Sequence, residues 1–189
     1  LKMDFLGLRN LDIITEALQS IKRNYGISLD IEKIPMETEV FEKIFATGKT
    51  HSVFQFESQG MREMLKNFQP SCIQDVILLV AAYRPGPLQY LDDIIAVKRG
   101  KKKSNYMIPQ MREILEQTYG KPIYQEQIMQ IFNKIAGFSL GEADIIRRYM
   151  SKKKTEKFAA YKDKFLDGMV ASGANRNDAE NFWEELLEF

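Results

Sequence analysis

The sequence has little cysteine and histidine, with one of each among 189 residues. A single cysteine cannot form an internal disulfide, and these two residues cannot build a Cys/His zinc site from this chain alone. Long apolar runs are also missing, since the longest is 76–83, and residues 1–12 lack the basic start and continuous apolar centre of a signal peptide. These absences predict a cytoplasmic protein with no membrane-spanning or secreted character.

Several catalytic motifs are absent as well. The chain contains no GxxxxGK[ST] loop, no GxGxxG after a strand and no HExxH pair, which excludes the usual nucleotide, dinucleotide and zinc-protease sites. Hydrophobic residues make up 44% and charged residues 28%, as in an ordinary globular protein, so a disordered or fibrous chain is excluded too.

Charge is balanced over the whole chain but not along it. Lys and Arg total 27 against 26 acidic residues, a formal net charge of +1, which by itself predicts no polyanionic partner. Residues 147–164, however, hold eight basic and two acidic side chains, and the basic run 98–103 holds no acid. Such segregation can steer a phosphate-rich ligand to one face, although a charge run is more often a solvated helix face or loop.

The pattern of apolar residues predicts a fold that is mainly α with a minor β element. Residues 1–5 alternate as in a short strand, residues 52–56 resemble a second extended piece, and apolar positions from 8 to 21 have helical spacing. Ser58, Ser71 with Gln74, Ser139 with Glu142, and Asn175 have the spacing of helix caps. Further helices are predicted over 36–46, 59–67, a segment ending at 82, 88–98, 109–117, 125–136, 140–150, 155–171 and 177–187.

Asp4 is the first candidate for chemistry, because it lies between apolar residues just before a glycine. On a strand, Lys2 and Asp4 would share a face. The pair could then hold a hard cation beside a phosphate, or it could be an ordinary surface ion pair at a strand edge.

A second candidate cluster lies on the predicted helix 140–150. Asp144, Arg147 and Arg148 are spaced i, i+3 and i+4, so the carboxylate can hold one or both guanidiniums, and the run Lys152, Lys153 and Lys154 follows. Guanidinium forks match phosphate oxygens, which suits a triphosphate or a nucleic-acid backbone. A surface salt bridge with cations at a helix C-terminus explains the same pattern equally well.

Two further segments have unusual composition. Residues 84–87 (Arg-Pro-Gly-Pro) must break the preceding helix. Residues 124–127 (Tyr-Gln-Glu-Gln) put an aromatic ring and three polar side chains at a helix start, which serves either base stacking with amide hydrogen bonding or a plain helix start.

Taken together, five motifs resemble the bacterial DNA polymerase III alpha subunit, the family C replicative polymerases, in the same order: residues 1–8, 53–58, 84–87, 124–129 and 141–148. The resemblance covers essentially the whole chain but implies an internal fragment of a longer one. It implies the C-terminal end of the palm domain, including its last strand, over 1–25 and the helical fingers domain over 26–189.

The resemblance also implies roles for individual residues. Asp4 matches the third metal-binding, catalytic aspartate of the palm, and Lys2 the lysine beside it that contacts the triphosphate. The other two aspartates are absent, so two Mg²⁺ ions are expected only in the intact enzyme and the fragment is expected to be inactive alone. The remaining matches are the dNTP-binding residues Arg84, Tyr124, Gln125, Arg147 and Arg148 and the DNA-binding residues Lys152, Lys153 and Lys154. Ser151 departs from the family, which usually has Gly there.

The function implied is that of a template-directed DNA polymerase, a nucleotidyltransferase that joins a dNTP to a primer 3′-OH by a two-metal mechanism. The expected partners are primer–template DNA, dNTP and other replisome subunits, with no membrane. The alternative is a non-catalytic helical module that binds nucleic acid or a protein partner through a basic face.

Overall fold

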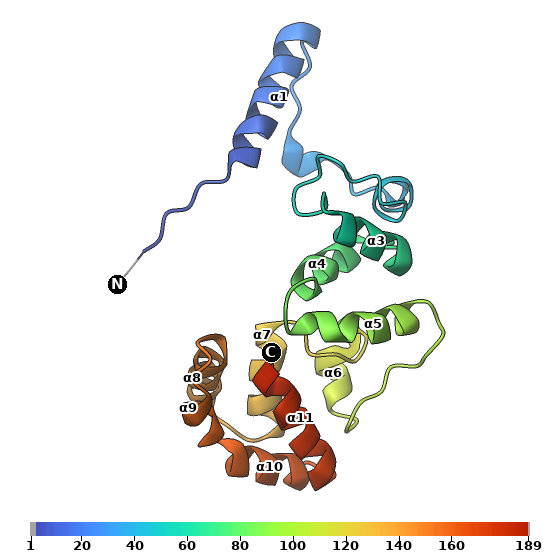
Figure 1. Cartoon of the computed structure of the whole chain (residues 1–189). Coiled ribbons are helices and arrows are strands. Elements are labelled where there is room, and N and C mark those ends of the chain that lie inside the picture. The colour runs from blue at the N-terminus through green and yellow to red at the C-terminus, as the bar shows by residue number, and fades with distance from the viewer. Residues whose placement is uncertain (1–2, 189) are drawn as a thin grey trace.

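The computed structural model describes residues 3–188, and over that range the protein is built from helices and turns without a strand. The helical elements follow one another from α1 at one end of the molecule to α8–α11 at the other (Figure 1). The predicted class is therefore confirmed in its main part, the helical fold.

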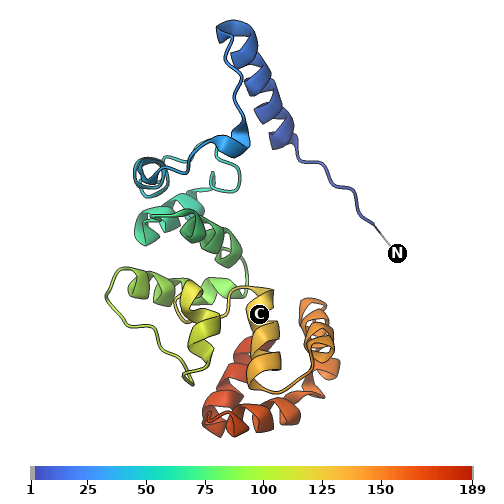
Figure 2. The ribbon, with the colours of Figure 1, turned by 180° about the vertical axis from the view of Figure 1, so that it is seen from behind.

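Helix α1 (Arg9–Tyr25) projects from the rest of the molecule in both views (Figures 1 and 2). It ends at Gly26, whose positive φ of 66° lets its N–H bond to the carbonyl of Lys22. None of its residues is buried. The helical spacing of apolar residues thus predicted this helix correctly, but its apolar side chains are not part of the two cores described next.

The first core is formed by buried side chains between residues 41 and 123, with Leu65, Phe68, Leu79 and Ile94 fully enclosed. The elements of this half are η1 (Ile31–Lys33), α2 (Thr38–Val40), η2 (Phe41–Phe45), α3 (Gln59–Phe68), α4 (Ile73–Ala82), η3 (Pro87–Tyr90) and α5 (Leu91–Lys98).

The second core is aromatic. Phe158 stacks on Trp183 with ring centroids 4.1 Å apart, and Phe132 and Phe165 pack around the pair. It is enclosed by α6 (Met111–Leu115), η4 (Glu116–Thr118), α7 (Gln125–Gln130), η5 (Ile131–Ile135), α8 (Leu140–Ser151), α9 (Thr155–Ala159), α10 (Lys162–Ala171) and α11 (Arg176–Glu188).

The predicted β element does not appear among the described residues. Residues 3–8 are extended but unpaired by any strand within the described range. Residues 52–56 form a turn with positive φ at Ser52 and Gln55, closed by a hydrogen bond from the Thr50 hydroxyl to the Phe56 carbonyl. Alternation describes which face a side chain would occupy, but a strand also needs a partner for its backbone. The proposed palm strand is therefore not present in residues 3–8, and residues 1–2 lie outside the described residues.

Most predicted caps are confirmed. Ser58 accepts from the N–H of Met61, Ser139 and Glu142 form a reciprocal capping box, and Asn175 accepts from the N–H of Asn177. The box predicted for Ser71 and Gln74 is wrong, because Asp75 accepts both the N–H and the hydroxyl of Ser71.

The helix predicted over 155–171 is divided into α9 and α10, since Ala160 and Tyr161 form a turn. In the described part of the chain, no helix is both long enough and apolar enough to cross a lipid bilayer.

Candidate functional site

A pocket of about 220 Å³ lies against the C-terminal turns of α8. Three separate segments meet there: the turn after α4, the start of α7 and the end of α8. The lining residues are Arg84, Pro85, Gln125, Ile128, Arg147, Met150 and Ser151.

The first wall comes from the turn that follows α4. Two prolines cannot continue the helix, and Gly86 between them adopts φ 91° and ψ −84°, a conformation that a residue with a Cβ would resist. The turn holds the exposed side chain of Arg84 at the pocket.

The second wall is fixed by a buried amide on α7. The side-chain oxygen of Gln127 accepts the N–H groups of Ile123 and Tyr124, each at 2.9 Å. Its NH₂ group donates to the carbonyl of Ile114 and the hydroxyl of Thr118, at 3.0 and 2.8 Å. Gln127 therefore anchors the start of α7 to the core. Sequence reasoning missed this role, although glutamine at the third position of a helix is a known capping signal.

The third wall carries an ordered ion cluster. Arg147 donates through Nε and Nη2 to Oδ1 of Asp144, at 3.1 and 2.7 Å, and through Nη1 to the side-chain oxygen of Gln125 at 3.1 Å. Arg148 pairs with Oδ2 of the same carboxylate at 2.6 Å. One carboxylate thus holds two guanidiniums, one of the arrangements that the spacing allowed. The hydrogen bond from Arg147 outweighs desolvation and, with the charge of Arg148, lowers the pKa of Asp144.

The two arginines differ in their surroundings. The Arg147 side chain is 28% exposed and lines the pocket, whereas the Arg148 side chain is 62% exposed and does not. Gln125 also donates to the hydroxyl of Ser151 at 3.4 Å. Ser151 is the last residue of α8, so the chain does not use the backbone freedom that Gly would offer there.

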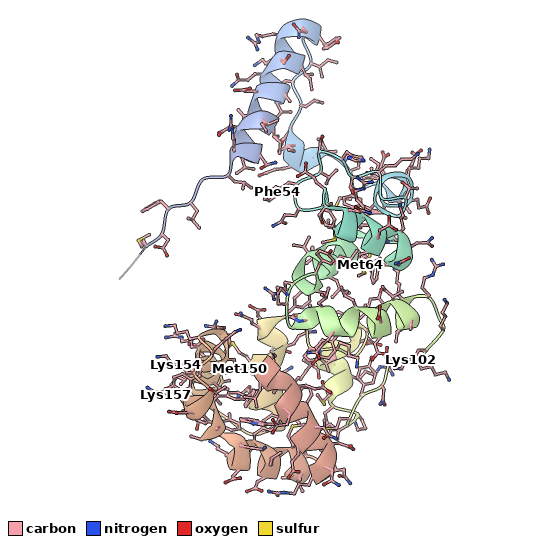
Figure 3. All side chains as sticks on the ribbon, in the orientation of Figure 1. Phe54, Met64, Lys102, Met150, Lys154 and Lys157 are labelled. Atoms are coloured by element: carbon pink, nitrogen blue, oxygen red, sulfur yellow. The ribbon has the colours of Figure 1, made fainter. Side chains whose placement is uncertain are left out.

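A basic loop follows directly, defined here as Lys152, Lys153, Lys154 and Lys157. All four side chains are exposed, and none has an acidic partner among the described side chains, those of residues 3–187. Figure 3 shows Lys154 and Lys157 near Met150, on the side of the molecule formed by α8 and α9. Their charge is therefore available to an anion from solution.

The other basic run, 98–103, lies elsewhere and is largely engaged. Figure 3 shows Lys102 well away from Lys154. Lys98 pairs with Asp75, Lys102 pairs with Asp93, and Arg99 donates to the side chain of Gln69. The two basic runs noted in the sequence thus do not form one face.

The predicted site residues are partly brought together. Arg84, Gln125 and Arg147 share the pocket, and the basic loop adjoins it through Ser151. Tyr124 does not line this pocket. It packs half-buried against the first core, and desolvation raises its pKa.

Asp4 lies on the extended segment 3–8, which leads away from the helical body in both ribbon views (Figures 1 and 2). Its side chain is exposed and does not line the pocket. Lys2 lies outside the described residues. Across residues 3–188 no group of three or more His, Cys, Asp or Glu side chains is arranged to hold a metal ion.

Comparisons of the chain with a protein family and with individual proteins point to the same group of proteins. The family described as "Bacterial DNA polymerase III alpha subunit finger domain" matches residues 10–173. The chain is 42% identical, over all 189 residues, to the DNA polymerase III subunit alpha of Halalkalibacterium halodurans, and 40% identical over the same length to those of Staphylococcus aureus strains COL and Mu50. It spans only 17% of the first relative and 18% of the other two.

Proposed function

The chain belongs to the finger-domain family of bacterial DNA polymerase III alpha subunits, and on that basis we propose that it is the fingers segment of a template-directed replicative DNA polymerase. In this role it binds the incoming dNTP and the DNA backbone while nucleotidyl transfer joins the dNTP to the primer 3′-OH. Primer–template DNA, dNTP and other replisome subunits are the partners of the longer polypeptide.

The observation that carries the proposal is the pocket at the end of α8. Arg84 and Arg147 bring two guanidiniums to a cavity that contains no carboxylate in its lining. Arg147 is already held by Asp144 and Gln125, so little side-chain freedom is lost when it meets a phosphate. The lining amide of Gln125 adds a polar group able to bond a ligand. This combination supports recognition of a triphosphate.

The basic loop supports a separate contact with DNA. Its lysines carry charge that no acid of the described residues neutralises, and lysine point charges suit a phosphate backbone. Lys152, Lys153 and Lys154 are accordingly proposed as DNA-binding residues, with Arg148 at the border between the loop and the pocket.

The residues of this chain do not fit a complete two-metal site. Asp4 is one carboxylate on an extended segment, and no cluster of three candidate ligands exists within residues 3–188. We therefore propose Asp4 as one ligand of a Mg²⁺ site whose other carboxylates belong to the rest of the polymerase, and we expect the isolated chain to be inactive.

Substitution of the two arginines in the full-length polymerase that carries this segment tests the proposal. Arg147→Ala should raise the KM for dNTP about tenfold, since a charged hydrogen bond contributes about 1.5–3 kcal/mol. Arg148→Ala is the matched control on the same helix and should change KM less, because its side chain lies outside the pocket.

An unchanged KM in a folded Arg147→Ala enzyme would contradict the proposal. It would favour the alternative function, a non-catalytic helical module that meets nucleic acid or a protein through the basic loop alone.

A further inference from the structure

A second pocket, of about 230 Å³, is lined in part by the basic loop and shares Met150 and Ser151 with the first. One part of its lining is apolar and comes from α8, α9 and α11. The other part is the backbone turn after α8. The residues used below are Tyr149, Phe158, Leu186, Leu187, Lys153 and Lys154.

The apolar part of the lining is anchored in the second core. Phe158 and Leu186 are held in the second core, and Leu187 is 40% exposed, so it can contact a ligand. Lys157 lies over the ring of Tyr149, 5.9 Å from its centroid. Aromatic and aliphatic surface of this kind suits the flat face of a nucleobase.

The charged part is held in an unusual backbone conformation. Lys153 has a positive φ of 49°, which is unfavourable for a residue with a Cβ. The turn is maintained because the N–H of Lys153 bonds to the carbonyl of Met150 and that of Lys154 to the carbonyl of Tyr149, each at 2.9 Å. Two lysines without acidic partners in the described range thereby border an apolar cavity.

We propose that this second pocket binds one unpaired nucleotide of single-stranded DNA, with its base on the apolar part and its phosphate at Lys153 and Lys154. A nucleotide has a flat apolar base and a negatively charged phosphate, and these match the apolar part and the charged part of the lining. A strand, rather than a free nucleotide, is favoured because Lys152 and Lys157 beside the pocket can meet further phosphates. The inference rests on the proposed contact between the basic loop and DNA.

Fluorescence anisotropy with the 189-residue chain tests the inference. The probes are a labelled short oligothymidylate and a labelled abasic oligomer of the same length, and both are titrated at the same series of salt concentrations. The chain should bind the oligothymidylate about tenfold more tightly, because stacking of one base contributes about 1–3 kcal/mol. Leu187→Gln should reduce this preference to about twofold or less.

Leu140→Gln is the matched control, since Leu140 is 64% exposed at the opposite end of α8 and should leave the preference unchanged. Equal affinity for the two oligomers, or a preference that survives Leu187→Gln, would overturn the pocket assignment. If salt-dependent binding of the abasic oligomer persisted in that case, the proposed DNA contact would stand. Loss of salt-dependent binding to both oligomers would overturn the DNA contact itself.

Discussion

Asp75 on α4 joins that helix to α5 and to Tyr119, which packs against the first core. It is almost fully buried and accepts hydrogen bonds from Lys98 at 2.6 Å, from Tyr119 at 3.0 Å and from the backbone of Ser71 at 2.8 Å. Burial alone would raise its pKa, but the bonds from Lys98 and Ser71 outweigh burial, so the pKa is lowered. Desolvation by burial, together with the charge and hydrogen bond of Asp75, raises the pKa of Tyr119.

Asp75→Ala should lower the free energy of unfolding by about 3 kcal/mol, because removing one partner of a buried ion pair leaves the other uncompensated. Asp93→Ala, which breaks two more exposed lysine pairs, should cost less than about 1 kcal/mol. Urea unfolding measures the free energy of unfolding of both variants. Equal decreases in the two variants would contradict the stabilising role assigned to the buried Asp75 pair.

The sign of the pH dependence follows from the lowered pKa of Asp75. Its stabilising contribution is fully present above the unfolded-state pKa of about 4 and is lost as the pH falls through the folded-state pKa. The difference between wild type and Asp75→Ala should therefore stay constant from neutral pH down to about pH 4 and narrow as the pH falls further.

Asp4→Asn in the full-length polymerase should abolish most of the turnover while DNA binding survives, since the amide keeps the shape of the side chain but loses the charge that attracts Mg²⁺. Single-turnover kinetics beside a DNA-affinity measurement would separate the two effects. Near-normal turnover would show that Asp4 is structural.

At the residue scale, the spacing of residues along the sequence predicted the interactions between neighbours on the same helix. Asp144, Arg147 and Arg148 are neighbours on one helix, and their pairing could be foreseen. The partners of Asp75 and Gln127 lie up to 44 residues away in the sequence, so only the folded chain brings them together. Which arginine lines the pocket likewise depends on where Gln125 lies.

At the scale of elements, the contact between η5 and α10 depends on one residue without a side chain. A Cβ added at Gly168 would lie 2.1 Å from the carbonyl oxygen of Ala136. Helix propensity favours alanine over glycine, but it cannot offset a clash with backbone.

Gly168→Ala should therefore destabilise the protein by about 2 kcal/mol, as overpacking does. Gly141→Ala is the control within α8, where a Cβ meets nothing within 4 Å, and it should be neutral or stabilising by about half a kcal/mol. Thermal unfolding of the two variants compares them directly. Similar shifts in both would mean that α10 does not pack closely on Ala136.

The predicted helices were largely found because capping and apolar spacing are local properties. The two predicted strands do not appear in the described range for a physical reason: residues 3–8 are extended but have no strand beside them, and residues 52–56 instead close a turn through Thr50. The break between α9 and α10 also escaped prediction, since the apolar pattern continues across Ala160 and Tyr161 while the chain turns.

At the scale of the whole molecule, the two hydrophobic cores are built from residues between Phe41 and Leu186, and α1 lies outside both cores. The predicted boundary between residues 25 and 26 stays a prediction. The distribution of charge matters more for function than the net value of +1. In the run 98–103, acids or an amide bind Lys98, Arg99 and Lys102, whereas no lysine of the basic loop after α8 has an acidic partner among the described side chains.

The central claim is that the end of α8 and its basic loop form the phosphate-binding face, and a salt titration of DNA affinity tests it most directly. The triple variant Lys152→Ala/Lys153→Ala/Lys154→Ala should reduce the log–log salt slope by about 2, since each phosphate contact contributes roughly 0.7–0.9. The control triple Lys43→Ala/Lys66→Ala/Lys134→Ala removes the same charge from lysines that are paired with acids, and it should leave the slope nearly unchanged. An equal reduction in both triples, or no reduction in the first, would contradict the claim.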